Sequence, residues 1–288
     1  MPVPPSLGSR LRLCYRRVLP ALLDSHCHPA DAVRAGTFGA YRAEAEAAGV
    51  VGLVAIGTDP SDWSLYRDLA AANPGYVRHT VGLHPNHVDE GWEDDVTALA
   101  PFFADAVAPA ALGEIGLDYF RLPEDPAAAA ATKARQQDAF RRQLGLAYEL
   151  GVPVVIHSRS AFHDCVRMID ASGVDWRKVV FHCFTESVEC ARELRRRGGR
   201  ASFTGVLTYP KSTVTRAALA SLGPDDLMLE TDAPYLAPQS HRGQENRSAY
   251  LGETLATAAE VLSMDARELG EITVRNAKAF FGFSGGAG

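Results

Sequence analysis

The segment 18–29, VLPALLDSHCHP, joins a short apolar run to an aspartate and two histidines at alternate positions. The apolar run is typical of a buried β-strand, and alternate side chains of a strand share a face. We therefore expect Asp24, His26 and His28 to point the same way. Two imidazoles held side by side can bind a divalent metal ion, but a single His-x-His motif also occurs in surface loops. The rest of the chain must decide between these interpretations.

Seven more short apolar or β-branched runs follow, with longer helical patterns between them. In windows such as 37–49, 64–75 and 138–153, apolar residues return every three or four positions, and glycine or proline ends the pattern. This alternation favours parallel strands with crossover helices. Eight units predict an α/β fold, a single-domain (β/α)8 TIM barrel, with an open doubly wound sheet as the alternative. The predicted strands are 21–26, 50–57, 77–84, 110–118, 152–158, 178–184, 199–206 and 226–234.

The composition is that of an ordinary globular protein, with 47% hydrophobic and 22% charged residues. No segment approaches the roughly 20 apolar residues that span a bilayer, so we expect no membrane partner. The formal charge of -6 argues against a generally basic surface that coats nucleic acid. Five cysteines without CxxC pairs favour reduced thiols and a cytoplasmic location.

The two ends of the chain differ from its centre. Residues 1–20 carry four arginines and no acid, and we expect a flexible basic N-terminal extension there. The apolar residues after these arginines run into LLDSHCHP without a small-residue cleavage region, so a secretory leader is not predicted. The barrel is expected over 21–282, followed by a flexible tail at 283–288.

Two segments between these ends have a local interpretation. Pro126 and the alanines after it predict a loop that enters a helix, because proline suits a first helical turn and alanine favours the helix. The stretch RELRRRGG, residues 192–199, predicts the end of a helix rather than a nucleic-acid patch. Cations are favourable at a helix C-terminus, and glycine commonly closes it.

Six potential metal ligands fall near the carboxyl ends of predicted strands. In a barrel these ends all open on one face, so the six side chains are expected to converge. Four imidazoles and two carboxylates exceed one tetrahedral zinc site, but they match a pair of divalent ions that share a bridging carboxylate. Purely structural roles would require six separate coincidences. The residues are His26, His28, Glu114, His157, His182 and Asp232.

With these residues in view, the chain resembles the TatD family of metal-dependent deoxyribonucleases, within the amidohydrolase superfamily. The resemblance runs from about residue 22 to residue 282. Several motifs in the right order are far more specific than one His-x-His. They are DSHCHP, VGLHP, GEIGLDYF, PVVIHSR, VFHCF and LMLETDAPYLAP followed by HRG.

The resemblance implies a role for each of the six residues. It makes His26 and His28 ligands of one metal ion, Glu114 the bridge, and His157 and His182 ligands of the second ion. It also implies that Asp232 binds the first ion and steers or deprotonates the attacking water, so Glu114 and Asp232 are the expected catalytic residues.

The chain departs from the family pattern at a few positions. Ser25 and Pro29 replace the usual threonine and leucine, at positions that should not contact metal. After HRG, Asn246 is kept but Arg247 and Ser248 replace an acid and a proline. The shape of the substrate loop is therefore less well defined than the metal centre.

Three residues are candidates for substrate binding: His84, Arg159 and Arg242. A guanidinium group can hold phosphoryl oxygens with two hydrogen bonds, and Arg159 follows a predicted ligand closely. The alternatives are a hydrogen-bonded supporting role for His84 and surface ion pairs for the arginines. Asp24 and Glu230 could each orient an imidazole or simply be polar residues of the barrel mouth.

The predicted reaction is phosphodiester hydrolysis by a metal-activated water, as in a 3'-5' exonuclease-like DNase. DNA ends are the expected substrate, with RNA or tRNA as further candidates. The cofactor is two divalent ions, and zinc, manganese, magnesium and iron all remain open. Superfamily lactonases and phosphotriesterases often use a carbamylated lysine, which is disfavoured here because Lys178 begins its strand, at the wrong end of the barrel.

Two other classes of function remain open at this point. The same centre could hydrolyse esters or amides, as in the deacylation of D-aminoacyl-tRNA, an activity that is also attributed to TatD-like proteins. A non-catalytic barrel that binds nucleic acid or a protein partner is the third class. Such proteins usually lose metal ligands, whereas all six are present here.

Overall fold

Eight parallel strands form one sheet whose spatial order follows the chain from β1 to β8. The computed structural model describes residues 19–283, and each strand overlaps its predicted run. The strands are β1 (Leu22–Cys27), β2 (Val50–Ala55), β3 (Val77–Val81), β4 (Ala111–Asp118), β5 (Val154–Arg159), β6 (Val179–Phe181), β7 (Arg200–Phe203) and β8 (Leu227–Leu229).

The sheet closes into a ring between β8 and β1. The Asp232 N–H donates to the His26 carbonyl at 2.9 Å, and the His28 N–H donates to the Ala233 carbonyl at 2.7 Å. Cys27 and Ala233 form an isolated parallel bridge. The segment after β8 therefore completes the ring. The prediction of a (β/α)8 barrel is confirmed, and the doubly wound alternative, whose strand order reverses at a switch point, is wrong.

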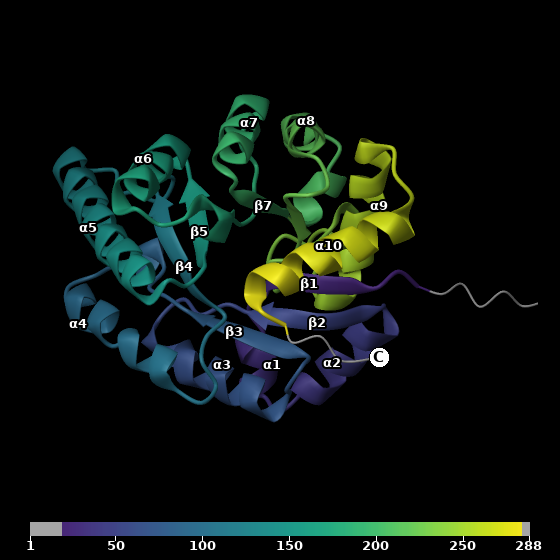
Figure 1. The fold of residues 1–288 in the computed structure, drawn as a ribbon, viewed down its shortest axis with the longest axis horizontal. Coiled ribbons are helices and arrows are strands. Elements are labelled where there is room, and N and C mark those ends of the chain that lie inside the picture. The colour runs from purple at the N-terminus through teal and green to yellow at the C-terminus, as the bar shows by residue number, and fades with distance from the viewer. Residues whose placement is uncertain (1–18, 284–288) are drawn as a thin grey trace, which may run out of the picture.

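Helices connect successive strands and surround the sheet (Figure 1). The α-helices are α1 (Ala30–Arg34), α2 (Phe38–Ala47), α3 (Pro60–Ala72), α4 (Trp92–Thr97), α5 (Pro126–Leu150), α6 (Phe162–Ser172), α7 (Val188–Arg197), α8 (Thr213–Leu222), α9 (Leu251–Leu262) and α10 (Ala266–Phe281). Short 3-10 helices are η1 (Pro85–His87), η2 (Ala100–Ala104), η3 (Trp176–Lys178), η4 (Gly205–Thr208), η5 (Gln239–His241) and η6 (Ser248–Tyr250).

Two predicted helix boundaries are confirmed. Helix α5 begins at Pro126, and the Asp125 carboxylate caps it by accepting a hydrogen bond of 2.8 Å from the Ala128 N–H. Helix α7 ends with three arginines and is closed by Gly198 at a φ of 85°. Glycine adopts this left-handed conformation without steric cost, so RELRRRGG stops the helix as expected.

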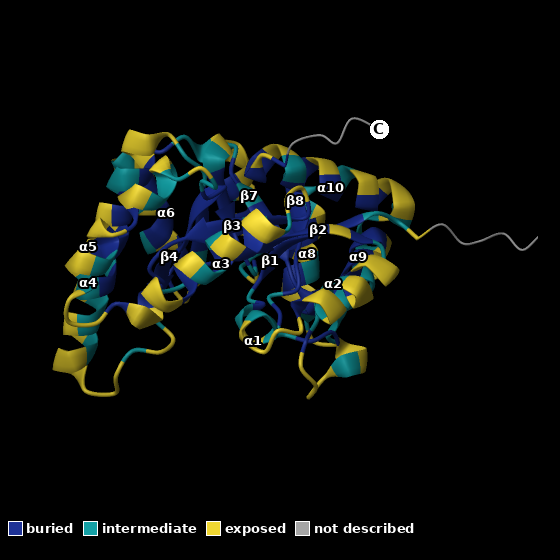
Figure 2. Ribbon diagram, turned by 90° about the horizontal axis from the view of Figure 1, so that it is seen from below, coloured by how far each residue is buried: buried dark blue, intermediate teal, exposed yellow. Residues whose placement is uncertain are grey.

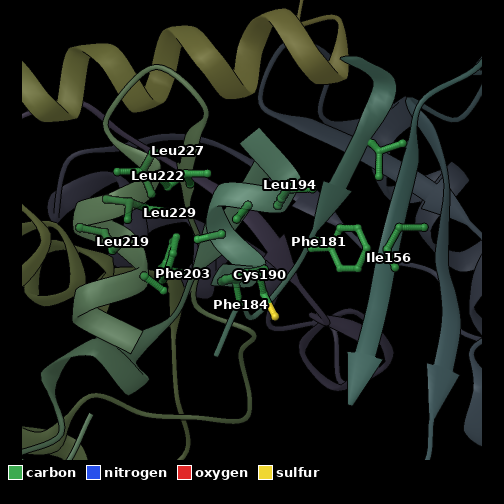
Figure 3. Close-up of a cluster of buried hydrophobic side chains, with 14 of the residues drawn as sticks. Ile156, Phe181, Phe184, Cys190, Leu194, Phe203, Leu219, Leu222, Leu227 and Leu229 are labelled. Atoms are coloured by element: carbon green, nitrogen blue, oxygen red, sulfur yellow. The ribbon is translucent and has the colours of Figure 1, made fainter. Parts of the chain in front are cut away.

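The apolar core has an outer layer between the sheet and its helices, and an inner part enclosed by the strands. Figure 3 shows part of the outer layer, where Leu219 and Leu222 of α8 lie near Phe203 and Leu229. The strands are mostly buried, whereas the helices expose their outer faces (Figure 2). The inner cluster draws apolar side chains from six strands, and α10 packs on it; the strand residues are Leu23, Val54, Ala111, Val155, Val180 and Met228.

The folded part includes the first residue of the predicted tail. Phe283 is only 8% exposed and packs in the inner cluster with Phe280 and Phe281 of α10. The rest of that tail and residues 1–18 of the predicted extension lie outside the described residues. Between residues 19 and 283, none of the helices combines the length and apolarity that crossing a membrane requires.

Candidate metal centre

All six predicted metal ligands meet at the carboxyl-end face of the barrel, where this architecture builds its active sites. His26, Glu114 and His157 lie within β1, β4 and β5. His182 and Asp232, which we predicted late in their strands, instead follow the ends of β6 and β8. A cavity of about 880 Å³ opens at this face, and all of the six except the fully buried His26 line it.

The Glu114 carboxylate lies at the centre of the group and is 3% exposed. Its Oε1 is 2.7 Å from His157 Nδ1 and 2.7 Å from His182 Nε2, whereas its Oε2 is 3.3 Å from His26 Nε2. Burial opposes its ionisation, but the neighbouring imidazoles, His182 foremost, lower the pKa of Glu114 well below its usual range. The two carboxylate oxygens therefore face two different sets of imidazoles.

Irregular backbone brings Glu114 to this position. The register between β4 and β5 shifts between Leu112 and Ile115, and the Glu114 N–H donates to the Gly57 carbonyl at 2.8 Å. Gly116 has a φ of 142°, and a Cβ there would overlap the backbone carbonyl of His157. Only glycine allows the two strands to approach so closely beside the site.

Asp232 and the two histidines of the first strand form the other side of the group. Asp232 Oδ1 is 3.3 Å from His28 Nε2 and 3.7 Å from His26 Nε2. Burial raises the pKa of Asp232, but the hydrogen bond with His28 and the nearby imidazoles outweigh burial and lower it. Asp232 is therefore an ionised carboxylate beside His28.

The donor atoms fit divalent metal ions. Two groups of three ligand atoms, each within 4.8 Å of one another, share Glu114: one is completed by His26 and His28, and the other by His84 and His157. Imidazole nitrogens combined with carboxylate oxygens are the donors that divalent transition metals and zinc prefer. The sharing of Glu114 matches a bridging carboxylate, although His84 was predicted as a substrate contact.

Glu230 supports His182 from the ring nitrogen that does not face Glu114. Its Oε1 is 3.4 Å from His182 Nδ1 and accepts a 2.7 Å hydrogen bond from the Cys183 N–H, and its other oxygen accepts from Ser202. Burial lowers the pKa of His182, but Glu114 and Glu230 raise it well above the usual range. Of the two roles left open for Glu230, the geometry supports the orientation of an imidazole.

Asp24 does not share a face with His26 and His28, and that prediction is wrong. The register between β1 and β2 shifts between Asp24 and Cys27, so the strict alternation of faces breaks there. The Asp24 carboxylate accepts hydrogen bonds of 2.6 Å from the hydroxyls of Thr231 and Ser248. It therefore supports the segment that carries Asp232 instead of an imidazole ring.

Sequence reasoning missed Asp118, which supports His157. Its Oδ2 is 3.3 Å from His157 Nε2 and accepts a 3.2 Å hydrogen bond from the Asn86 side chain. Burial raises the pKa of Asp118, but the bond with His157 and further hydrogen bonds outweigh burial and lower it to about 2. The sequence could have indicated Asp118, because it follows Glu114 by four residues in the same strand, and residues at even spacing in a strand share a face.

The three predicted substrate contacts have different surroundings. His84 lines the cavity, and its Nε2 is 3.4 Å from Glu114 Oε1. Arg159 also lines the cavity, as do two arginines that were not predicted, Arg34 and Arg121. Arg242 lies outside the lining of this cavity, with its guanidinium 5.0 Å from the centre of the Tyr209 ring. The structure therefore brings two of the three predicted contacts to the centre.

The fold and the site define a class of protein: a (β/α)8 barrel with a histidine and carboxylate centre, suited to metal ions, at the carboxyl ends of its strands. Comparison with known proteins narrows this class. The family model described as TatD related DNase matches residues 23–282. The chain therefore belongs to the TatD-related DNase family.

Individual relatives agree with this assignment. The uncharacterized metal-dependent hydrolase YcfH of Escherichia coli K12 is 33% identical over 265 residues, covering 90% of this chain and 95% of YcfH. The 3'-5' ssDNA/RNA exonuclease TatD of Yersinia pseudotuberculosis is 34% identical over 246 residues, covering 82% of this chain and 90% of the relative. By family membership the chain is a metal-dependent hydrolase.

Solved structures share the fold. The crystal structure of YJJV, a TatD homologue from Escherichia coli K12, superimposes with a TM-score of 0.82 at 27% identity, covering 91% of this chain and 98% of YJJV.

Proposed function

We propose that this chain hydrolyses phosphodiester bonds at the ends of DNA strands, using two divalent ions at the candidate metal centre. The observation that carries the proposal is the division of the Glu114 carboxylate between two sets of imidazoles. Such a carboxylate can bridge two ions, and two-metal sites are common in nucleases and phosphatases. Relatives named 3'-5' ssDNA/RNA exonuclease, 32–34% identical to this chain, support the choice of substrate.

In this proposal each half of the centre holds one ion. His26 and His28 would hold the first, His157 and His182 would hold the second, and the Glu114 carboxylate would be shared between them. The donor set is rich in nitrogen, which suits zinc, manganese or iron better than magnesium. When bound, the ions would lower the pKa of a water molecule and stabilise negative charge on the phosphoryl oxygens.

The side chains around the ions have their own tasks. Asp232 would help to hold the first ion, and its ionised carboxylate would accept the proton of the attacking water. Arg159 and His84 line the cavity and contact the phosphate, the arginine through its planar guanidinium. Arg242 has no part in this proposal, because it does not line the cavity.

The charge distribution is compatible with an anionic substrate despite the formal charge of -6. Arg34, Arg121 and Arg159 line the cavity together with six carboxylates, so a positive potential there would depend on the two dications when they are bound. A positive spot confined to one cavity favours a strand end over a long duplex.

Two substitutions test the proposal: Glu114→Ala and Asp232→Asn. We expect each to reduce cleavage of 3'-labelled single-stranded DNA by at least about a thousandfold, because each removes a group that acts in the transition state. Metal content, measured by mass spectrometry, should fall in Glu114→Ala, while circular dichroism stays that of the folded protein. The matched controls are Glu149→Ala and Asp225→Asn, at exposed positions.

Undiminished DNA cleavage in both variants would refute the assignment. Turnover on D-aminoacyl-tRNA, measured beside DNA, tests the ester-hydrolase alternative. If the wild-type protein deacylates this tRNA and leaves DNA intact, the proposed substrate is wrong.

A further inference from the structure

Two large aromatic side chains are exposed at the rim of the candidate metal centre. Phe120 is 65% exposed and Tyr235 is 62% exposed, although burial of such rings is normally favourable. Phe120 follows the end of β4, and Tyr235 follows β8 and lines the cavity. Rings that stay exposed beside a cavity are available to a ligand.

Each ring is anchored to a residue of the centre through its own backbone. The Phe120 N–H donates to the Asp118 carboxylate at 3.0 Å, and Asp118 contacts His157. The Tyr235 N–H donates to the Asp232 carbonyl at 2.8 Å, and its ring centre lies 6.2 Å from that of His28. Both rings are therefore held in a defined relation to the site.

The two rings lie on opposite sides of the barrel mouth. The strands follow one another in chain order around the ring, so β4 and β8 are separated by half of the barrel in either direction. A phosphodiester held at the centre would thus have one ring on each side.

Arg159 extends the flat surface of Phe120. Its guanidinium carbon lies 3.9 Å from the centre of the Phe120 ring, and Arg159 lines the cavity two residues after His157. A guanidinium stacked on an aromatic ring keeps its N–H groups free for phosphate oxygens. The pair thus presents a stacking surface and a phosphate contact together.

We propose that Phe120 with Arg159, and Tyr235 opposite them, form two base-stacking subsites that hold unpaired nucleotides on either side of the scissile phosphate. The inference rests on the proposed function and deepens it by selecting the substrate. Every base offers a flat face to an aromatic ring, so such subsites tolerate any sequence. Bases within a duplex are already stacked on one another, so the subsites select single-stranded ends.

The test compares Phe120→Ala, Tyr235→Ala and the double variant, with Tyr148→Ala as the matched control. Tyr148 is 61% exposed, but it lies near the end of α5 and does not line the cavity. We expect each rim variant to raise KM for 3'-labelled single-stranded DNA about tenfold, since one stacked base contributes roughly five- to hundredfold in affinity. Metal content and kcat should change little.

An oligonucleotide with abasic sites at its last two positions provides the decisive comparison. The wild-type protein should bind it as weakly as the double variant binds the normal oligonucleotide, and the variants should lose nothing further on it. If Phe120→Ala and Tyr235→Ala leave the preference for the normal end unchanged, the stacking inference is wrong while the proposed nuclease function stands.

A binding measurement separates the two proposals further. A single-stranded oligonucleotide with a terminal 2-aminopurine and uncleavable phosphorothioate linkages should lose fluorescence on binding to the metal-loaded wild-type protein. The loss should be smaller in both rim variants and unchanged in Tyr148→Ala. Quenching without any DNA cleavage would refute the proposed nuclease function alone. Absence of quenching in the wild-type protein would refute the inference of stacking subsites.

Discussion

The two sides of the candidate metal centre are held in place by different kinds of contact. On the β4 and β5 side, Glu114 and His157 lie within strands, and Gly116 is paired with His157 in the sheet register. On the β8 and β1 side, Asp232 lies three residues after β8 ends, at a φ of 56°. Pairing within the sheet holds the first pair, with a register shift beside Glu114, whereas the second side needs other support.

A buried polar network gives that support. Asp24 is completely buried and accepts hydrogen bonds from the Thr231 N–H at 2.9 Å, the Thr231 hydroxyl at 2.6 Å and the Ser248 hydroxyl at 2.6 Å. Ser248 is in turn 2.7 Å from the Tyr41 hydroxyl of α2. Because Thr231 directly precedes Asp232, one carboxylate holds the segment on which the proposed proton acceptor lies.

The centre thus has one side that is held by many contacts and one side that depends on few. Sheet hydrogen bonds and apolar packing are distributed over many residues, so the loss of one is tolerated. Loss of a buried carboxylate that accepts from several donors should be strongly destabilising, because each donor left unpaired carries a desolvation penalty.

The largest effect is expected from Asp24→Ala. The change removes the acceptor of the Thr231 N–H and of the Thr231 and Ser248 hydroxyls, and it should lower the free energy of unfolding by roughly 3–5 kcal/mol. Urea denaturation of the EDTA-treated protein measures this, with Asp225→Ala at an exposed position as the control. A decrease under about 1 kcal/mol would remove the distinction between the two sides.

The second effect depends on pH. Burial raises the pKa of Asp24 from 3.8 to about 6, although its hydrogen bonds oppose this. The folded protein therefore binds the proton more tightly than the unfolded chain, and this group makes stability fall as pH rises from about 4 to about 6, by roughly 2–3 kcal/mol. Asp24→Asn lacks this dependence.

The difference in unfolding free energy between the wild-type protein and Asp24→Asn should therefore shift in favour of the variant between pH 4.5 and pH 7.5. Taking the difference cancels the titration of the histidines, which both proteins share. The measurement requires EDTA-treated protein, because a bound dication would lower the pKa of Asp24. Parallel pH profiles for the two proteins would contradict the prediction.

On the β4 and β5 side, Asp118→Asn should act on metal binding more than on folding. Asparagine can still accept hydrogen bonds from the backbone N–H groups of Phe120 and Arg121, but it loses the negative charge beside His157. Loss of such a supporting carboxylate typically lowers metal affinity about 10- to 100-fold. Competition titration with a metal-binding dye measures the change, and Asp138→Asn on the exposed face of α5 is the control.

An unchanged metal affinity in Asp118→Asn would restrict Asp118 to shaping the loop after β4. The two sides would then differ even more, with supporting carboxylates important only beside β1 and β8.

The smallest effect is expected from Tyr41→Phe, which removes the outermost hydroxyl of the Asp24 network. Ser248 keeps its bond to Asp24, so the unfolding free energy should fall by only about 0.5–1.5 kcal/mol. Thermal and urea denaturation measure it, with Tyr148→Phe as the control. A loss as large as that of Asp24→Ala would mean that the network acts as one unit through Tyr41.

The barrel and most of the candidate site could be predicted from the sequence alone. Buried parallel strands appear as short apolar runs separated by helical patterns, so eight units could be counted without coordinates. Reactive side chains near strand ends can also be recognised from their neighbours in the sequence. His26, Glu114, His157 and His182 could be found by their position after or within an apolar run. Parallel strands then force these ends to one face.

Contacts between distant segments of the chain could be learned only from the tertiary structure. The face of Asp24 could not be predicted, because a register shift of one residue reverses the alternation and leaves no mark in the composition. The bond between Asp24 and Ser248 joins residues 224 positions apart, and Arg242 and Arg159 look equivalent as letters although only Arg159 lines the cavity. Periodicity is a property of neighbours along the chain, whereas these contacts depend on where distant segments meet.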